Sequence, residues 1–358
     1  MGSRSGLNPD FVDKAYTWCR QYLRGPWARV EKHEFNVENF AGAGLSNYLY
    51  ICSIPANKTQ TGPNKVLLRI HGEILDDSSI ALTESIVFSL LAERKIAPKL
   101  YGIFQGGRIE EYIPSRSLTV EEMGYESYNI EIAQKLAGFH GMDLPLSKEP
   151  TWVINMCHRW LHEVLHSISF TTPELDTKYN KLLSYGLPEE LKYLEKMIEV
   201  TSSPTVFCHN DLNEGNILLV NSDSKCNRLM FIDFEYAGYN HRGFDIANHF
   251  CEWTFDYTTT TPPYYKYDPE NYPNKEQQLR FIRAYLNSFD NAMNDLESRE
   301  TEEVKMLTEI KRFSMLSHFF WVLWAIIQGK KSQHKFCHLD YAQTRIEAYF
   351  EVKNQITL

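Results

Sequence analysis

Three polar residues lie beside two short apolar runs in the second half of the chain. Asp211 and Asn216 belong to the polar segment within the strand-like residues 206–220, and Asp233 lies in the next strand-like run, 229–234. Phosphoryl transfer requires a carboxylate that accepts the proton of the attacking hydroxyl, and oxygen ligands that hold Mg²⁺ against the phosphates. Asp211 could be that base, and the oxygens of Asn216 and Asp233 could bind the metal. We expect His209 to support this loop through hydrogen bonds rather than to act as a base; the alternative for the whole segment is a capped turn beside a buried aspartate.

The first third of the chain offers a candidate phosphate-binding cation and a turn rich in small residues. The sequence Gly42-Ala-Gly-Leu-Ser46-Asn47 lacks the third glycine of a Gly-x-Gly-x-x-Gly loop, so on its own it indicates only a tight turn. Arg69 lies in the strand-like run 65–70, where a guanidinium would stay charged and could bind phosphate through two nitrogens. Glu84 falls in the apolar stripe of the helix-like segment that follows, where burial without a cation would be costly. We therefore expect an Arg69–Glu84 ion pair; the alternative is an exposed Glu84.

A group of aromatic residues follows the polar segments. Trp321 and Trp324 lie three residues apart and so share a helix face. The other candidate members are four aromatic residues and one carboxylate: Tyr236, Glu252, Tyr257, Phe336 and Tyr341. A cage of such rings binds a quaternary ammonium through cation–π attraction, because that cation has no N–H to donate, and Glu252 would add long-range attraction. Periodicity alone favours plain core packing for the two tryptophans, so both interpretations stay open.

These residues must be positioned by strands in the first third and by helices in the rest. Strand-like runs at 65–70, 100–105 and 108–113 accompany one helix-like segment, which predicts a small antiparallel β-rich lobe at residues 1–113. Apart from the runs at 206–220 and 229–234, residues 114–358 are mostly of helical periodicity and predict a large, mainly helical lobe. The expected fold class is α+β.

The composition excludes several classes of protein. The 358 residues are 43% hydrophobic and 23% charged, as in globular proteins, and the formal net charge of −9 argues against a nucleic-acid partner. Seven dispersed cysteines without a Cys-x-x-Cys pair indicate a reducing compartment. The longest apolar stretch, 319–327, is far shorter than the ~20 residues that span a bilayer, and no signal peptide is recognisable. We expect a cytoplasmic protein without a membrane span.

Two longer segments resemble signature sequences of the choline/ethanolamine kinase family, a relative of the aminoglycoside kinases and the protein kinases. They are Phe207-Cys-His-Asn-Asp-Leu-Asn-Glu-Gly-Asn-Ile-Leu and Ile232-Asp-Phe-Glu-Tyr-Ala-Gly-Tyr-Asn-His-Arg-Gly-Phe-Asp-Ile-Ala-Asn-His-Phe-Cys-Glu-Trp253. The resemblance extends from about residue 41 to residue 349. It implies a two-lobed protein-kinase-like fold, with nucleotide bound by the N-terminal lobe and with catalysis and choline binding in the C-terminal lobe.

The same resemblance implies an activity and a set of site residues. The activity is ATP-dependent phosphorylation of choline to phosphocholine, the first step of phosphatidylcholine synthesis by the CDP-choline route, with ethanolamine as a further substrate. Asp211 would be the catalytic base, Asn216 and Asp233 the Mg²⁺ ligands, and Arg69 a ligand of the nucleotide phosphates. Ser46 and Asn47 would lie in the phosphate-covering loop, and the adenine-side hinge would consist of Glu110, Glu111, Tyr112 and Ile113. The residues that match the family's choline pocket are Tyr236, Glu252, Tyr257, Trp321, Trp324, Phe336 and Tyr341, and a homodimer is also implied.

Departures from the protein kinases favour a small-molecule acceptor. Asp233-Phe-Glu replaces Asp-Phe-Gly, and no Ala-Pro-Glu follows it, so a protein-kinase activation segment is not expected. Two alternatives remain: an enzyme that acts mainly on ethanolamine, and a non-catalytic kinase-like module that only binds nucleotide or choline. The intact set of Asp211, Asn216 and Asp233 argues against the second.

Overall fold

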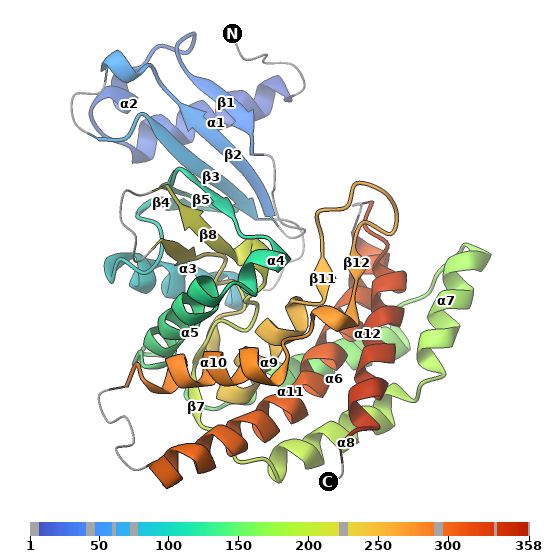
Figure 1. Cartoon of the computed structure of the whole chain (residues 1–358). Helices are drawn as coiled ribbons and strands as arrows, with labels where there is room; N and C mark the ends of the chain where they lie inside the picture. The colour runs from blue at the N-terminus through green and yellow to red at the C-terminus, as the bar shows by residue number, and fades with distance from the viewer. Residues whose placement is uncertain are drawn as a thin grey trace. The chain divides into compact units, whose positions relative to one another are not determined.

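The chain forms two compact units in the computed structural model (Figure 1). Unit 1 consists of Met1–Arg116 and Leu218–Glu235, and unit 2 consists of Ser117–Ile217 and Tyr236–Leu358. The structure describes residues 7–40, 47–58, 62–71, 78–221, 228–289, 296–332 and 335–356. Residues 218–235 lie far along the sequence from the rest of unit 1, so unit 1 is built from two separate stretches of chain.

Unit 1 contains an antiparallel sheet of five strands. Its order is β1 (Asn36–Asn39), β2 (Asn47–Ser53), β3 (Lys65–His71), β5 (Gly107–Glu111) and β4 (Leu100–Phe104), and Figure 1 shows these strands side by side. Alternate residues of β3 point to opposite faces, and Val66 and Leu68 are completely buried. Gly106, with φ of 88°, makes the tight turn between β4 and β5, a backbone conformation that glycine adopts without strain.

Two helices that the sequence analysis did not predict cover the apolar face of this sheet. They are α1 (Pro9–Tyr22) and the single turn α2 (Pro26–Arg29). Cys19 of α1 and Trp27 of α2 pack in one buried cluster with Val66 and Leu68. The predicted helix is α3 (Ser78–Glu93), and a short 3₁₀ turn, η1 (Ala56–Lys58), lies between β2 and β3.

A second, smaller sheet contains the hairpin that precedes Asp233. Its order is β6 (Ser115–Ser117), β8 (Ile217–Val220) and β9 (Leu229–Phe231). Asn216 directly precedes β8, and Asp233 follows β9 by two residues.

Unit 2 is mainly helical. Its helices are α4 (Val120–Met123), α5 (Glu126–His140), α6 (Trp152–His166), α7 (Pro173–Leu183), α8 (Leu187–Glu199), α9 (Arg242–Glu252), α10 (Lys275–Leu286), α11 (Leu296–Lys331) and α12 (His338–Lys353). Two short antiparallel pairs interrupt them: β7 (Thr205–Cys208) with β10 (Gly238–His241), and β11 (Phe255–Asp256) with β12 (Lys266–Tyr267). The 3₁₀ turns η3 (Glu214–Asn216) and η4 (Pro269–Asn271) complete the described elements.

Helix α11 forms the centre of unit 2. It packs against α12, α9 and α6, and Phe319, Phe320, Val322 and Leu323 are completely buried. By length and composition this helix could cross a membrane, but 89% of its most apolar window is buried inside the protein. Packing against the other helices therefore accounts for its apolar side chains.

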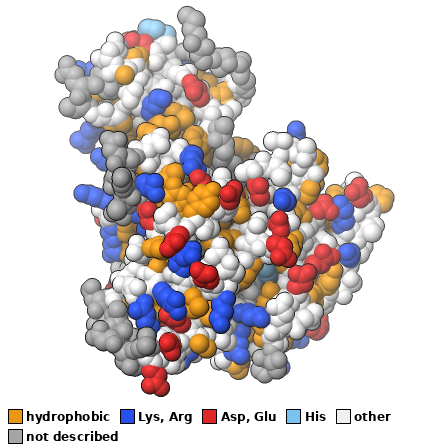
Figure 2. Space-filling view, in the orientation of Figure 1, with side chains coloured by type: hydrophobic (Ala, Val, Ile, Leu, Met, Phe, Trp, Pro, Cys, Tyr) orange, Lys and Arg blue, Asp and Glu red, His pale blue; other side chains and the backbone are white. Residues whose placement is uncertain are grey.

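The predicted α+β class is confirmed. The strand-like runs around the polar segment contain β7, β8 and β9, and the helical periodicity predicted after residue 114 corresponds to helices α4 to α12. Six cysteines in the described ranges are free thiols, and five of these six are buried. Figure 2 shows acidic and basic side chains interspersed over the face in view.

Candidate active site

The polar loop after β7 is held in place by Asp245 of helix α9. The Asp245 carboxylate accepts hydrogen bonds from the backbone N–H groups of His209 and Asn210, each at 2.7 Å, and lies 2.9 Å from Nε2 of His140. Burial alone would raise the pKa of Asp245, but the hydrogen bonds from His140 and His209 outweigh it and hold that pKa below its usual value. Asn210 adopts φ of 66°, a left-handed conformation that asparagine tolerates better than most residues. The loop backbone is thus fixed by a buried, ionised carboxylate.

Two amide side chains orient the carboxylate of Asp211. Nδ2 of Asn213 donates to Oδ1 of Asp211 at 3.1 Å, and Nδ2 of Asn216 donates to Oδ2 at 3.1 Å and to the Asp211 carbonyl at 2.8 Å. With Nδ2 turned toward Asp211, the amide oxygen of Asn216 is the atom turned away from it. Nδ1 of His209 accepts from the backbone N–H of Asp211 at 3.3 Å. Asp211 is therefore an oriented, half-buried carboxylate, the arrangement that a general base requires.

In unit 1, Arg69 and Asp233 are in direct contact. Nη1 of Arg69 lies 2.9 Å from Oδ1 of Asp233, and Nε lies 3.4 Å from Oε1 of Glu110. Burial alone would lower the pKa of Arg69, but the carboxylates of Asp233 and Glu110 raise it, so the guanidinium stays charged. Asp233 has φ of 64°, again in the left-handed region. Unit 1 thus holds a fixed cation, Arg69, in contact with Asp233, the carboxylate that follows β9.

The expected ion pair between Arg69 and Glu84 is wrong, because the arginine that contacts Glu84 is Arg108. Glu84 is buried, as expected of a paired residue, but its Oε1 lies 2.6 Å from Nη1 of Arg108. Arg108 is the register partner of Arg69 across β3 and β5, and Nε of Arg108 lies 3.2 Å from Oε2 of Glu110. Two like charges opposed on neighbouring strands repel each other, so the carboxylates of Glu84, Glu110 and Asp233 are needed to hold both arginines.

The structure describes four of the five other residues that were expected near the nucleotide. Ser46 lies outside the described residues, and Asn47 is the first residue of β2, in register with His71. Glu111 ends β5, and its Oε2 accepts from the backbone N–H of Lys99 at 3.2 Å. Tyr112 and Ile113 directly follow β5 and are half-buried.

The structure brings the aromatic candidates of unit 2 into one connected cluster. Ring centroids are 5.9 Å apart for Tyr236 and Trp321 and 5.4 Å for Trp321 and Trp324. His338 then links Trp324 to Phe336, at 5.9 and 5.0 Å. We call the following set the aromatic cluster: Tyr236, Tyr257, Trp321, Trp324, Phe336, His338 and Tyr341, in which Phe336 lies 5.4 Å from Tyr341 and 6.3 Å from Tyr257.

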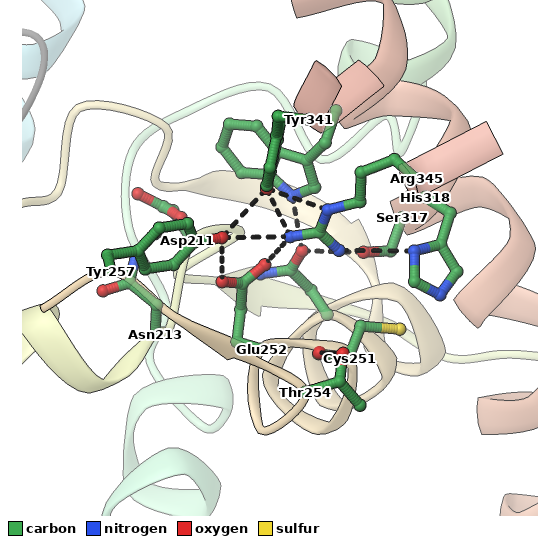
Figure 3. A network of polar contacts seen from close by, with 12 residues as sticks. Asp211, Asn213, Cys251, Glu252, Thr254, Tyr257, Ser317, His318, Tyr341 and Arg345 are labelled. Carbon is green, nitrogen blue, oxygen red and sulfur yellow. Dashed lines mark hydrogen bonds and ion pairs between the residues drawn. The ribbon is translucent and has the colours of Figure 1, made fainter. Parts of the chain in front are cut away.

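Glu252 meets this cluster at the tyrosine end, where it forms an ion pair with Arg345 (Figure 3). Oε2 of Glu252 accepts from the hydroxyl of Tyr257 at 2.9 Å, and its Oε1 accepts from Nη2 of Arg345. Both charged residues are buried, with 2% of Glu252 and none of Arg345 exposed. The long-range attraction expected of Glu252 is therefore cancelled in large part by a cation in direct contact with it.

Helix α9 connects the loop to the cluster. Asp245 binds the loop backbone, His249 donates from Nδ1 to the Leu212 carbonyl at 2.9 Å, and Glu252 binds Tyr257 and Arg345. These three residues are spaced at i, i+4 and i+7 and so lie on one face of the helix. Burial lowers the pKa of His249 to about 4, which keeps it neutral, and Trp253 donates to its other ring nitrogen.

A separate cavity of about 560 Å³ opens on unit 2. Its wall includes Glu121, Asp256, Lys266, Asp268 and Glu270. Of the predicted site residues that the structure describes, none lines this cavity.

Comparison with known proteins identifies the family of the chain. The sequence profile of the choline/ethanolamine kinases matches residues 37–350. A protein of Homo sapiens named choline/ethanolamine kinase is 45% identical over 357 residues, which cover 99% of this chain and 89% of that protein. The chain belongs to the choline/ethanolamine kinase family.

Other members of the choline/ethanolamine kinase family agree with this assignment. Choline kinase alpha of Mus musculus is 43% identical over 368 residues, covering 96% of this chain and 81% of that one. Among solved structures, a choline kinase from Cryptosporidium parvum superposes with a TM-score of 0.75 at 27% identity, covering 96% of each chain. The two-lobed kinase-like fold and the use of ATP follow from this membership.

Sequence reasoning did not find several residues that organise the site of this chain. Asn213, Asp245 and Arg345 orient other site residues, and Arg108 neutralises Glu84. A signal existed for Arg345, because a residue four positions after Tyr341 on a helix lies on the same face. For Arg108 the signal was its spacing of two from Glu110, which puts both side chains on one face of a strand.

Proposed function

We propose that this protein transfers the γ-phosphoryl group of ATP to the hydroxyl of choline, giving phosphocholine and ADP, and that ethanolamine is a second, poorer substrate. Most support comes from helix α9, which anchors both the loop of Asp211 and the tyrosine end of the aromatic cluster. One helix thus positions a candidate base and a candidate site for a cationic substrate. The names of the human and mouse relatives support the same choice of substrate.

Asp211 is the proposed general base. Its two oxygens are oriented by Asn213 and Asn216, and its backbone by the contacts of Asp245 with the preceding residues. As the choline oxygen bonds to the γ-phosphorus and the bond to the β-phosphate oxygen breaks, the hydroxyl proton passes to the Asp211 carboxylate. Because the carboxylate is held in place, little reorganisation is needed at the moment of transfer.

Asn216 and Asp233 are the proposed magnesium ligands. Asn216 offers an amide oxygen and Asp233 a carboxylate, the hard oxygen donors that Mg²⁺ prefers. A magnesium ion held by these residues would neutralise negative charge on the nucleotide phosphates. Arg69, which contacts Asp233 at 2.9 Å, is proposed to bind a phosphate oxygen beside it, and Glu110 orients Arg69 from the other side.

The aromatic cluster is the proposed choline site. Ring faces attract a trimethylammonium group by about 0.5–2 kcal/mol each, without any hydrogen bond. The indole N–H of Trp321 donates to Oδ1 of Asn248 at 2.7 Å, so this ring is fixed by a polar contact as well as by packing. Such a site would recognise the methyl groups and the charge of choline together.

Further parts of the proposal concern organisation. We propose that residues 1–113 bind the nucleotide, that residues 114–358 carry catalysis and choline binding, and that the protein acts as a cytoplasmic homodimer. Sedimentation of the purified chain tests the oligomeric state, and a fluorescent fusion tests the location.

The central experiment compares three acceptors in an assay that couples ADP release to NADH oxidation. Choline should give the highest kcat/KM, ethanolamine a lower one, and kanamycin none; mass spectrometry should detect phosphocholine. A higher kcat/KM with ethanolamine would make the protein mainly an ethanolamine kinase. ADP release with none of the three would leave a non-catalytic binding module.

A further inference from the structure

Arg345 of α12 lies at the centre of a closed hydrogen-bond ring with Glu252, Tyr257 and Tyr341 (Figure 3). Its Nε donates to the Tyr341 hydroxyl at 2.8 Å and its Nη2 at 2.5 Å. Nη2 also contacts the Tyr257 hydroxyl at 3.4 Å, and the guanidinium carbon lies 3.9 Å from the ring centroid of Phe255. The side chain is completely buried, so its orientation is fixed from several sides.

The chemistry of the four side chains sets the direction of every proton in the ring. A guanidinium only donates and an ionised carboxylate only accepts, while a tyrosine hydroxyl has one proton to give. The proton of Tyr257 therefore goes to Oε2 of Glu252, at 2.9 Å. The oxygens of Tyr257 and Tyr341 are 2.9 Å apart, and because Tyr257 has used its proton, Tyr341 must be the donor between them.

Each side-chain oxygen of this hydrogen-bond ring therefore already accepts a hydrogen bond. Oε1 of Glu252 accepts from Arg345, Oε2 from Tyr257, the Tyr257 oxygen from Tyr341, and the Tyr341 oxygen from Arg345. The negative charge of Glu252 is balanced by the same guanidinium. His318 adds no second positive charge beside Glu252, because burial and the charge of Arg345 lower the pKa of His318. Its neutral Nδ1 lies 3.3 Å from Nη1 of Arg345.

This hydrogen-bond ring should favour a methylated ammonium group over a primary one. A trimethylammonium group has no N–H and loses nothing against oxygens that are already engaged. A primary ammonium brings three N–H groups, and oxygens that already accept a hydrogen bond and whose charge Arg345 balances are weaker acceptors for them, so burying this ammonium carries a larger desolvation penalty. The tyrosine rings themselves stay available to either cation.

We infer that Arg345 is a positioning residue that sets the preference for a methylated over a primary ammonium, by engaging the oxygens of Glu252, Tyr257 and Tyr341. This inference rests on the proposed function, because it assumes that the aromatic cluster receives the cationic end of the substrate. Arg345 itself acts through its three partners. Without its donors, the Glu252 carboxylate and the two hydroxyl oxygens could accept from an N–H group.

The test compares Arg345→Met with the double variant Arg345→Met/Glu252→Gln. Both lose the same guanidinium and its packing on Phe255, and they differ only in whether residue 252 can carry a charge. The measured quantity is the ratio of kcat/KM for choline to kcat/KM for ethanolamine, with the KM for ATP as a reference. In Arg345→Met the ratio should fall about ten- to a hundredfold, the size of one or two hydrogen bonds to a charged group. In the double variant the fall should be clearly smaller than in the single variant, because a neutral amide oxygen accepts an ammonium N–H more weakly than an unpaired carboxylate does.

Three results would overturn the inference: an unchanged ratio in a folded Arg345→Met that still phosphorylates choline, an equal loss for both substrates, or a double variant that matches the single one. If Arg345→Met does not fold, Arg345→Lys replaces it, since lysine keeps the charge but cannot reach Glu252 and Tyr341 as a planar fork. Its ratio should fall in the same direction, and an unchanged ratio would again contradict us. Failure of the wild-type protein to phosphorylate either amino alcohol would instead reject the proposed function.

Discussion

Asp245 and Asn210 are joined by a hydrogen bond of 2.7 Å between a buried carboxylate and a backbone N–H. The contact comes from helix α9 and fixes the residue directly before Asp211 in a left-handed conformation. A loop held at its backbone can present Asp211 without support from substrate. The position of the proposed base is thus built into the fold.

We predict that Asp211→Asn lowers kcat for choline by about 10²–10⁴-fold, the usual contribution of a positioned base. Asparagine has nearly the same shape but cannot take the proton, so the KM for choline and the thermal midpoint should stay close to wild type. Steady-state kinetics and calorimetry measure these quantities. More than about a tenth of the wild-type kcat in this variant would remove Asp211 from that role.

Arg69→Lys should raise the KM for ATP roughly tenfold and change the KM for choline little. A lysine cannot contact Asp233 and Glu110 together as the guanidinium does, and one charge-assisted hydrogen bond is worth about that factor. Lys32→Met, which breaks an exposed ion pair with Asp13, is the control and should leave both constants unchanged. Equal increases in both KM values would indicate general destabilisation instead.

The pair of Glu84 and Arg108 allows a double-mutant cycle. Arg108→Met leaves the buried Glu84 carboxylate without its arginine and should cost about 3–5 kcal/mol in the free energy of unfolding, whereas Glu84→Met should cost less, because Arg108 keeps its contact with Glu110. The double variant should cost less than the sum of the two. Urea titrations of the four proteins give the coupling energy.

A second cycle with Arg69→Met in place of Arg108→Met serves as the control. Arg69 contacts Glu110 and Asp233, while Glu84 contacts Arg108, so the coupling between Glu84 and Arg69 should be much smaller. A stronger coupling of Glu84 to Arg69 than to Arg108 would restore the ion pair that the sequence suggested.

The Glu84 case shows where prediction from sequence stops. An apolar stripe interrupted by one glutamate indicates a buried, paired carboxylate, and this part is confirmed. The partner depends on the register of β3 against β5, which sets Arg69 opposite Arg108, and a one-residue shift would turn each side chain to the other face. Register comes from tertiary packing, so local patterns could not choose between two arginines.

Other parts of the fold and site also divide into those that sequence patterns predict and those that depend on tertiary packing. The strands around His209–Asn216 and the α+β class follow from periodicity and are confirmed. Helix α1 was missed because its polar start resembles a disordered terminus, although Asn8 caps it and Pro9 opens it. The ring of Arg345, Glu252, Tyr257 and Tyr341 joins α9, α12 and the segment after β11, which only three-dimensional packing brings together.

The protein should lose stability in acid partly through His249. Its pKa is lowered by burial from 6.5 to about 4, so the folded state favours the neutral imidazole. This contribution is fully present above pH 6.5 and is lost as the pH falls to about 4, where the folded protein also takes up the proton. The loss amounts to about 3 kcal/mol. His249→Gln cannot be protonated, so its unfolding free energy should fall less steeply in this window. Parallel curves for His249→Gln and wild type would contradict this assignment.

The final prediction separates a cation-binding cluster from an ordinary apolar core. Trp324→Leu should raise the KM for choline a few-fold to about thirtyfold, more than that for ethanolamine, while the KM for ATP stays near wild type, because the indole face attracts a charge that methyl groups surround. Trp160→Leu is the matched control, since that tryptophan is 8% exposed against 9% for Trp324 and lies outside the cluster; it should lower stability without changing the preference between amino alcohols. The neutral alcohol 3,3-dimethylbutanol has the shape of choline without its charge, and it should compete poorly with choline. Competition as strong as that of choline itself would mean that Trp321 and Trp324 only fill the interior of unit 2.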